Sequence, residues 1–204
     1  MHIQVQCCGI ILMLLLLFFY LRQRRVSLKT EQAFLRAFCV TLACIVFDIL
    51  SIVVIARKEE LPNLFVELIC KSYLATLLGV ALCALSYICV DVYSTKKHYK
   101  KEVLKYQLSA LVGMLFIYIL PIHYQFGEDG KTVLYTYGPS VISTYIFAVG
   151  LLIVIFYLMK KEKNKISPRR REAVGLWMGI WLCASLIQFL NNELLIVGYA
   201  CSLG

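Results

Sequence analysis

The residues that could do chemistry lie inside strongly apolar stretches of this sequence. Asp48 and Lys71 each fall about seven residues from the end of an apolar run, which is near 10 Å deep if the runs are membrane-crossing helices. A charge at that depth is costly and usually faces a partner. We expect either an ion pair between Asp48 and Lys71, or a pair of Lys71 with Glu67 while Asp48 is neutral or hydrogen-bonded.

Other polar side chains fall in the same half of the expected helices. A few polar groups that converge between apolar walls are typical of a small-molecule site, so we interpret them as a candidate ligand pocket. The candidate ligand-binding residues are Asp48, Lys71, Tyr73, Tyr135, Tyr137, Tyr145, Gln188 and Asn191. Two alternatives remain open: a structural network of hydrogen bonds between helices, and anchoring of the tyrosines at the membrane interface.

Catalytic motifs are absent from the sequence. It contains no GxSxG, no HExxH, no glycine-rich phosphate loop and no pair of histidines inside an apolar run. The nine cysteines form no CxxC pair and lie in or beside apolar runs, where they act as small hydrophobes. We therefore expect no enzyme activity, metal or cofactor in this chain, and we interpret Trp177 and Trp181 as packing residues rather than a cofactor cage.

Composition places the chain in a membrane. Hydrophobic residues make up 61% of the 204 residues and charged residues only 16%, with a mean hydropathy of +0.78. About 20 apolar residues of helix cross a bilayer, and only helices satisfy the backbone of such segments within themselves. The sequence predicts one all-α polytopic domain over residues 1–204, with six full helices and a truncated seventh at about 5–21, 35–56, 64–92, 106–122, 140–159, 173–190 and 194–204.

The positions of the basic residues predict the orientation. Three short connections hold 17 of the 21 lysines and arginines, after the first, third and fifth runs. By the positive-inside rule these connections are cytoplasmic, which places the N-terminus and the connection at 123–138 outside the cell membrane. The basic blocks could also bind anionic lipid headgroups, but their confinement to short loops argues against nucleic acid.

The last apolar segment is too short to cross. Residues 194–204 would make a helix about 16 Å long, roughly half of a hydrocarbon core. We expect either a chain cut inside its seventh helix or a re-entrant segment.

Several stretches together support a resemblance. They are the opening helix with its basic loop, Phe47 to Ile52, Cys70 to Leu74, Tyr135 to Ser140 with Tyr145, and Ile187 to Phe189 followed by Leu194 to Gly198. In their order and spacing they resemble the seven-helix N-terminal sensory module of clostridial membrane-bound GGDEF proteins, which are diguanylate cyclases. In that family the seventh helix continues into a linker and a GGDEF domain, and neither is in this sequence.

The resemblance implies reception of a signal at the membrane and synthesis of cyclic di-GMP by a cytoplasmic domain, in a homodimer. A related module can precede a histidine kinase instead. From the residues, a receptor for a small extracytoplasmic ligand is the first hypothesis. The alternatives are a small secondary transporter, which predicts inverted repeats and broken helices, and a structural membrane subunit.

Overall fold

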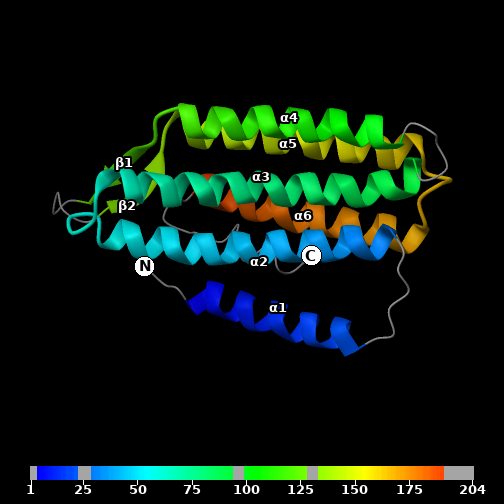
Figure 1. The fold of residues 1–204 in the computed structure, drawn as a ribbon, viewed down its shortest axis with the longest axis horizontal. Coiled ribbons are helices and arrows are strands. Elements are labelled where there is room, and N and C mark those ends of the chain that lie inside the picture. Colours follow the sequence, from blue (N-terminus) through cyan, green and yellow to red (C-terminus); the bar gives the residue numbers. More distant parts are fainter. Residues whose placement is uncertain (1–3, 23–28, 94–98, 128–132, 191–204) are drawn as a thin grey trace.

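The computed structural model describes residues 4–22, 29–93, 99–127 and 133–190 (Figure 1). Within these residues the chain forms six helices and one two-stranded sheet. The order is α1 (Gln4–Arg22), α2 (Lys29–Ala56), α3 (Asn63–Tyr93), α4 (Tyr99–Ile119), β1 (His123–Phe126), β2 (Val133–Tyr137), α5 (Pro139–Lys161) and α6 (Pro168–Leu190).

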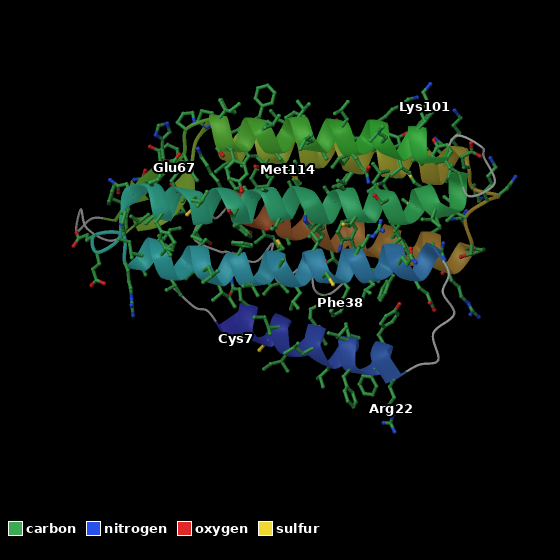
Figure 2. All side chains as sticks on the ribbon, viewed as in Figure 1. Cys7, Arg22, Phe38, Glu67, Lys101 and Met114 are labelled. Carbon is green, nitrogen blue, oxygen red and sulfur yellow. The ribbon has the colours of Figure 1, made fainter. Side chains whose placement is uncertain are left out.

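The helices run side by side, and successive helices alternate in direction (Figure 1). One end of the bundle, which we call the hairpin end, holds β1, β2 and the turn between α2 and α3. The opposite end, the basic end, holds the connection between α5 and α6. Figure 2 shows Glu67 at the hairpin end and Arg22 and Lys101 at the basic end. Charged residues thus gather at the two ends of an apolar bundle.

Three helical segments are long and apolar enough to cross a membrane: Glu31–Ala56, Asn63–Val90 and Pro139–Lys161. Shorter apolar helices cover Gln6–Tyr20 and Val103–Ile119. The chain is therefore mainly helical, with three candidate membrane spans, and the six crossings expected from the sequence remain a prediction. Residues 194–204, where we expect a seventh helix, lie outside the described residues.

Helix α3 is the centre of the bundle and packs against α2, α4 and α5. Its buried residues include Leu78, Leu85 and Ile88, all fully covered. On α4, by contrast, Leu104 and Leu108 are more than half exposed although both are apolar. A helix that is apolar on its outer face as well as its inner face is suited to lipid rather than water.

Glycine permits the close approach of α4. A Cβ atom on Gly113 would lie 2.8 Å from Cγ of Phe147 on α5 and 2.9 Å from Cδ2 of Leu78 on α3. No real side chain is accommodated at such distances without movement of its neighbours. Small residues let membrane helices approach each other in this way, so Gly113 sets the position of α4 between α3 and α5.

Helix α6 is held to the bundle by large side chains. Trp177 and Trp181 are 8% and 1% exposed and belong to the main apolar core, as expected of packing residues. Helix α1 contacts α2 and forms a separate small core in which Met13 meets Phe38 and Ile45.

The connection after α4 contains a β-hairpin, which the all-α prediction missed. β1 and β2 are antiparallel, with His123 opposite Tyr137, and an irregularity follows at Gln125 and Phe126. The segment is rich in aromatic and β-branched residues, which favour strands, but two short strands alone give a weak sequence signal. Of the tyrosines that we expected as interfacial anchors, Tyr135 and Tyr137 lie on β2, whereas Tyr73 is buried on α3.

Helix boundaries also differ from those predicted. Helix α4 begins at Tyr99 and ends at Ile119, rather than covering 106–122, and α6 begins at Pro168 rather than 173. Lysine, arginine and glutamate are good helix formers, so both helices extend past the apolar stretch into charged sequence. Pro121 has no backbone N–H to continue α4, and Pro168 suits the first position of α6.

Candidate functional site at the hairpin end

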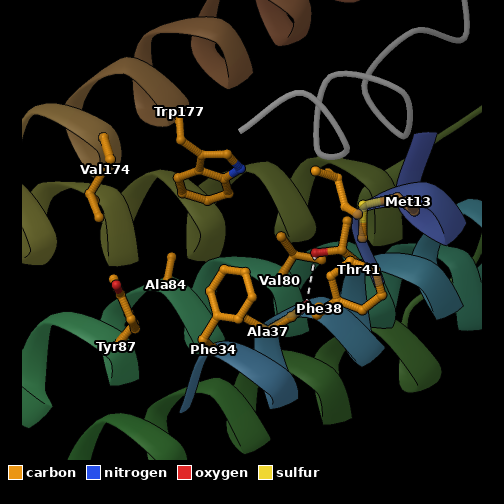
Figure 3. A pocket seen from close by; sticks show the side chains of 12 residues that line it. Met13, Phe34, Ala37, Phe38, Thr41, Val80, Ala84, Tyr87, Val174 and Trp177 are labelled. Atoms are coloured by element: carbon orange, nitrogen blue, oxygen red, sulfur yellow. Dashed lines mark hydrogen bonds between the residues drawn. The ribbon is translucent and has the colours of Figure 1, made fainter. Parts of the chain in front are cut away.

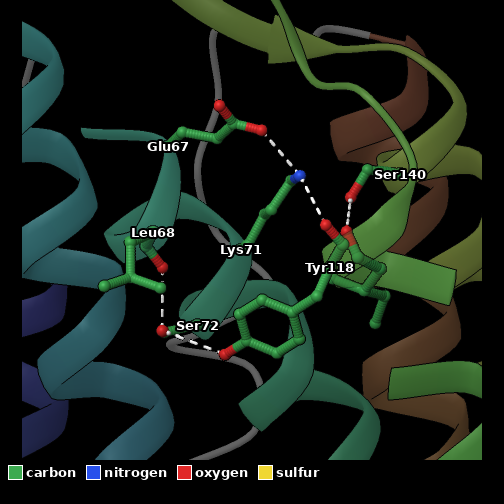
Figure 4. Close-up of polar contacts among 7 residues, drawn as sticks. Glu67, Leu68, Lys71, Ser72, Tyr118 and Ser140 are labelled. Carbon is green, nitrogen blue, oxygen red and sulfur yellow. Dashed lines mark hydrogen bonds and ion pairs between the residues drawn. The ribbon is translucent and has the colours of Figure 1, made fainter. Parts of the chain in front are cut away.

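Lys71 is the centre of a polar cluster between α3 and α4 (Figure 4). Its ammonium group lies 2.6 Å from Oε1 of Glu67 and donates a hydrogen bond of 2.9 Å to the carbonyl oxygen of Tyr118. The Lys71 side chain is 7% exposed and that of Glu67 39%. Lys71 therefore reaches from a buried backbone position toward the more open end of the bundle.

The same cluster closes the C-terminus of α4. The last carbonyl groups of a helix have no partner within the helix, and a positive charge near them is favourable. The carbonyl of Tyr118 is satisfied by Lys71, and the Ser140 hydroxyl donates to the carbonyl of Ile117 at 2.9 Å. Side chains of α3 and α5 thus complete the hydrogen bonding of α4 at a point where water is scarce.

The start of α5 is fixed by a second set of hydrogen bonds. The backbone N–H of Ser140 donates to the carbonyl of Pro121 at 3.3 Å, and Thr144 donates its hydroxyl proton to the carbonyl of Ser140 at 3.0 Å. Gly138, just before the helix, has a φ of 117°. A Cβ atom there would lie 2.8 Å from Cδ2 of His123, so both conformation and space require glycine.

Tyr118 also connects α4 to α3 through its hydroxyl. The hydroxyls of Ser72 and Tyr118 are 3.2 Å apart, and Ser72 donates its own proton to the carbonyl of Leu68 at 2.8 Å. Tyr118 is therefore the donor between the two hydroxyls. Both the carbonyl and the side chain of Tyr118 bind α3.

The turn between α2 and α3 contacts the hairpin through Lys58. The Lys58 ammonium lies 3.5 Å from the ring centre of Tyr124 and 4.7 Å from that of Phe126, a cation–π arrangement. Burial lowers the pKa of Lys58 below its usual value. Burial also raises the pKa of Tyr124, so that its phenol stays protonated at neutral pH.

The Tyr124 hydroxyl is buried and has no hydrogen-bond partner among the described residues. A buried polar atom without a partner is uncommon and marks a place where a ligand or water could bind. The turn that carries Lys58 and the part of α3 that carries Glu67 and Lys71 lie at the same end of the bundle as Tyr124. The site therefore offers two cations, a carboxylate and a free hydroxyl donor.

Comparison of the chain with family models, with curated proteins and with solved structures finds no match. The geometry of the molecule is thus the basis for assigning a function.

Asp48 does not belong to this cluster. The two alternatives for Lys71 are resolved in favour of Glu67, and the expected ion pair between Asp48 and Lys71 is wrong. Asp48 is fully buried on α2, and the side chain that approaches its carboxyl group is Gln6 of α1. Neither carboxyl oxygen has a hydrogen-bond partner of good geometry among the described residues. An i, i+4 pair within one helix needs no particular helix packing, which explains why it forms instead.

The remaining predicted residues lie in three different places. Tyr73 is buried in the main core. Tyr135 and Tyr137 are neighbours on β2, where the Tyr137 ring also contacts His123 with 5.5 Å between centres. Tyr145 lines an apolar groove between α5 and α6, beside Ser185. The structure therefore brings Lys71 and the hairpin tyrosines to one end of the bundle, whereas Asp48 approaches Gln6, Tyr73 is part of the core and Tyr145 lines a different groove.

Two predicted residues are not described in full. Gln188 lies on α6, and its side chain is outside the described part of the structure. Asn191 is outside the described residues altogether.

Several residues of the cluster were missed by the sequence prediction. Lys58, Tyr118, Tyr124 and Ser140 lie at helix ends or in the hairpin, where their residue types are common. A lysine in a turn between two helices and a serine after a helix-starting proline are ordinary features of a helical protein. Only the packing of α3, α4 and the hairpin brings them to the same end of the bundle.

A separate apolar cavity of about 220 Å³ lies in the half of the bundle nearer the basic end (Figure 3). Met13, Phe34, Val80 and Trp177 bring α1, α2, α3 and α6 to its walls. Two residues that line it carry hydroxyl groups, Thr41 and Tyr87, and Thr41 donates to the carbonyl of Ala37 at 2.9 Å. The cavity offers few polar groups, so it does not replace the hairpin end as the candidate site. No cluster of potential metal ligands occurs within the described residues.

Proposed function

We propose that this chain is a membrane-embedded receptor module that detects a small extracytoplasmic ligand at its hairpin end. In this proposal six helices cross the cell membrane, the N-terminus lies outside, and a seventh helix carries the signal to a cytoplasmic GGDEF output domain. The main support is the Lys71 cluster, in which one buried cation joins the end of α4 to the centre of the bundle.

The charges of the cluster favour a ligand with an acidic group. Such a group would compete with Glu67 for Lys71, and the Tyr124 hydroxyl and Lys58 provide further donors nearby. Because Lys71 also binds the Tyr118 carbonyl, a ligand that moves the ammonium group would release the end of α4.

In this proposal the bundle has two helix arrangements that bind the ligand with different affinity, and the signal is the change in their populations when the ligand binds. A ligand shifts such an equilibrium only by the free energy it gains in one arrangement over the other. Helix α3 contacts α2, α4 and α5, so a movement of α3 at Lys71 would also displace these three helices.

The test uses the full-length gene product in cells that carry a fluorescent cyclic di-GMP reporter. Small carboxylic acids are added outside, and dose curves are compared for the wild type, Lys71→Met and the control Lys101→Met, which is exposed at the basic end. We expect Lys71→Met to shift or abolish the response and Lys101→Met to preserve it. An unchanged curve for Lys71→Met would exclude the proposed pocket, and a gene without a GGDEF reading frame after Gly204 would exclude the proposed output.

A further inference from the structure

A groove of about 560 Å³ lies between α5 and α6 at the basic end of the bundle. Its walls are apolar and include Phe156 and Met159 of α5 and Met178 and Leu182 of α6. Gly175 and Gly179 also line it, and a Cβ atom on either glycine would meet no atom within 4 Å. The glycines are therefore not needed for packing within the described structure, and they leave the groove open.

The rim of the groove is positively charged. It is lined by Lys160 at the end of α5, Lys163 in the connection that follows and Arg171 near the start of α6, and by no aspartate or glutamate of the described residues. The nearby carboxylate of Glu162 is bound to Lys165 at 2.5 Å. Three cations above an apolar groove complement a molecule with an anionic head and an apolar tail.

The length of the groove matches one leaflet of a bilayer. Arg171 and Leu182 are 11 positions apart on α6, which gives a rise of about 16 Å, and half of a hydrocarbon core is about 15 Å. The charged rim then lies at headgroup level while the glycines lie at the level of the acyl chains.

We propose that this groove binds one anionic phospholipid, with its phosphate between Lys160, Lys163 and Arg171 and one acyl chain along Gly175 and Gly179. The site is distinct from the hairpin end and does not depend on the receptor function. A second copy of the chain is a weaker candidate for the same groove, although paired small residues are common at helix dimer interfaces. A symmetric parallel dimer would bring two basic rims together, which is unfavourable because like charges repel.

The test measures lipid binding to the purified full chain in detergent. Phosphatidylglycerol or phosphatidylcholine is titrated, and bound lipid is counted by native mass spectrometry. We expect phosphatidylglycerol to bind at least about tenfold more tightly than phosphatidylcholine, since each basic side chain near an anionic headgroup contributes appreciably.

Two sets of variants locate the site. The triple variant Lys160→Gln, Lys163→Gln, Arg171→Gln should lose the preference for phosphatidylglycerol. The matched control Arg36→Gln, Lys101→Gln, Lys161→Gln removes the same charge from exposed residues outside the groove and should keep it. The double variant Gly175→Leu, Gly179→Leu places side chains in the groove at positions where a Cβ atom meets nothing within 4 Å, and it should weaken binding of both lipids.

Three results would overturn the proposal. If the wild type binds both lipids with equal affinity, the groove does not recognise an anionic headgroup. If the rim variant and the control variant lose the preference for phosphatidylglycerol equally, the preference comes from the overall charge of the protein and not from a site in this groove. A leucine variant that binds lipid normally but changes from dimer to monomer would identify the groove as a contact between two copies.

Discussion

The ammonium group of Lys71 lies 2.9 Å from the carbonyl oxygen of Tyr118, so a side chain of α3 completes the C-terminus of α4. Lys71 also pairs with Glu67, which is more exposed. The carbonyl depends on Lys71 for its hydrogen bond, whereas Glu67 is open enough to be solvated. The two partners of Lys71 should therefore contribute unequally to stability.

Replacement of Lys71 by methionine should lower the free energy of unfolding by about 1–3 kcal/mol, because it leaves the Tyr118 carbonyl unsatisfied in an apolar setting. Glu67→Gln should cost less than about 1 kcal/mol, as expected of a partly exposed ion pair. Both values can be measured by titration with sodium dodecyl sulfate in mixed micelles. A larger loss for Glu67→Gln than for Lys71→Met would contradict this assignment.

Gly113→Ala should destabilise the bundle, because the new methyl group would lie within 3 Å of Phe147 and Leu78. Overpacking of this kind costs about 1–3 kcal/mol. Gly150→Ala on α5 is the matched control, since a Cβ atom there meets nothing within 4 Å and alanine favours helix. Thermal unfolding in detergent should separate the two variants, and equal midpoints would show that α4 is not closely packed at Gly113.

Gly138→Ala should be destabilising for two separable reasons. The φ of 117° is unfavourable for alanine, and the methyl group would meet the ring of His123 at 2.8 Å. In the double variant with His123→Ala, the methyl group no longer meets the His123 ring, so only the destabilisation from the unfavourable φ remains. A double-mutant cycle on the unfolding free energy should therefore give a favourable coupling, and strict additivity would rule out the contact.

Asp48→Asn should leave stability unchanged or raise it, because a buried carboxyl group without good hydrogen bonds is replaced by a neutral group of the same shape. The measurement is thermal unfolding in detergent, combined with the cyclic di-GMP reporter. Loss of signal at normal stability would indicate a functional role for Asp48. A destabilisation above about 1 kcal/mol would instead show that the Gln6 contact is an important structural bond.

The orientation can be tested with single cysteines in a variant that lacks the native ones. Gln125→Cys on β1 and Asn164→Cys in the connection between α5 and α6 are both at exposed positions. An impermeant thiol reagent on intact cells should label Gln125→Cys, and Asn164→Cys only after permeabilisation, because basic connections stay in the cytoplasm. The opposite pattern would invert the topology and place the Lys71 cluster inside the cell.

The sequence was sufficient for the main elements of the fold. Helices were correctly expected around all six described segments, because long apolar runs bounded by charged residues have few other structures open to them. The hairpin and the charged starts of α4 and α6 were missed, since short strands and interfacial helix turns give weak local signals.

The sequence by itself determined that this chain is helical, with segments long and apolar enough to cross a membrane, because hydropathy and charge placement act locally along the chain. Only the tertiary structure decided which partner each intramembrane charge takes. Lys71 pairs within its own helix and with the end of α4, while Asp48 faces α1, because side-chain contacts depend on the rotation and depth of packed helices.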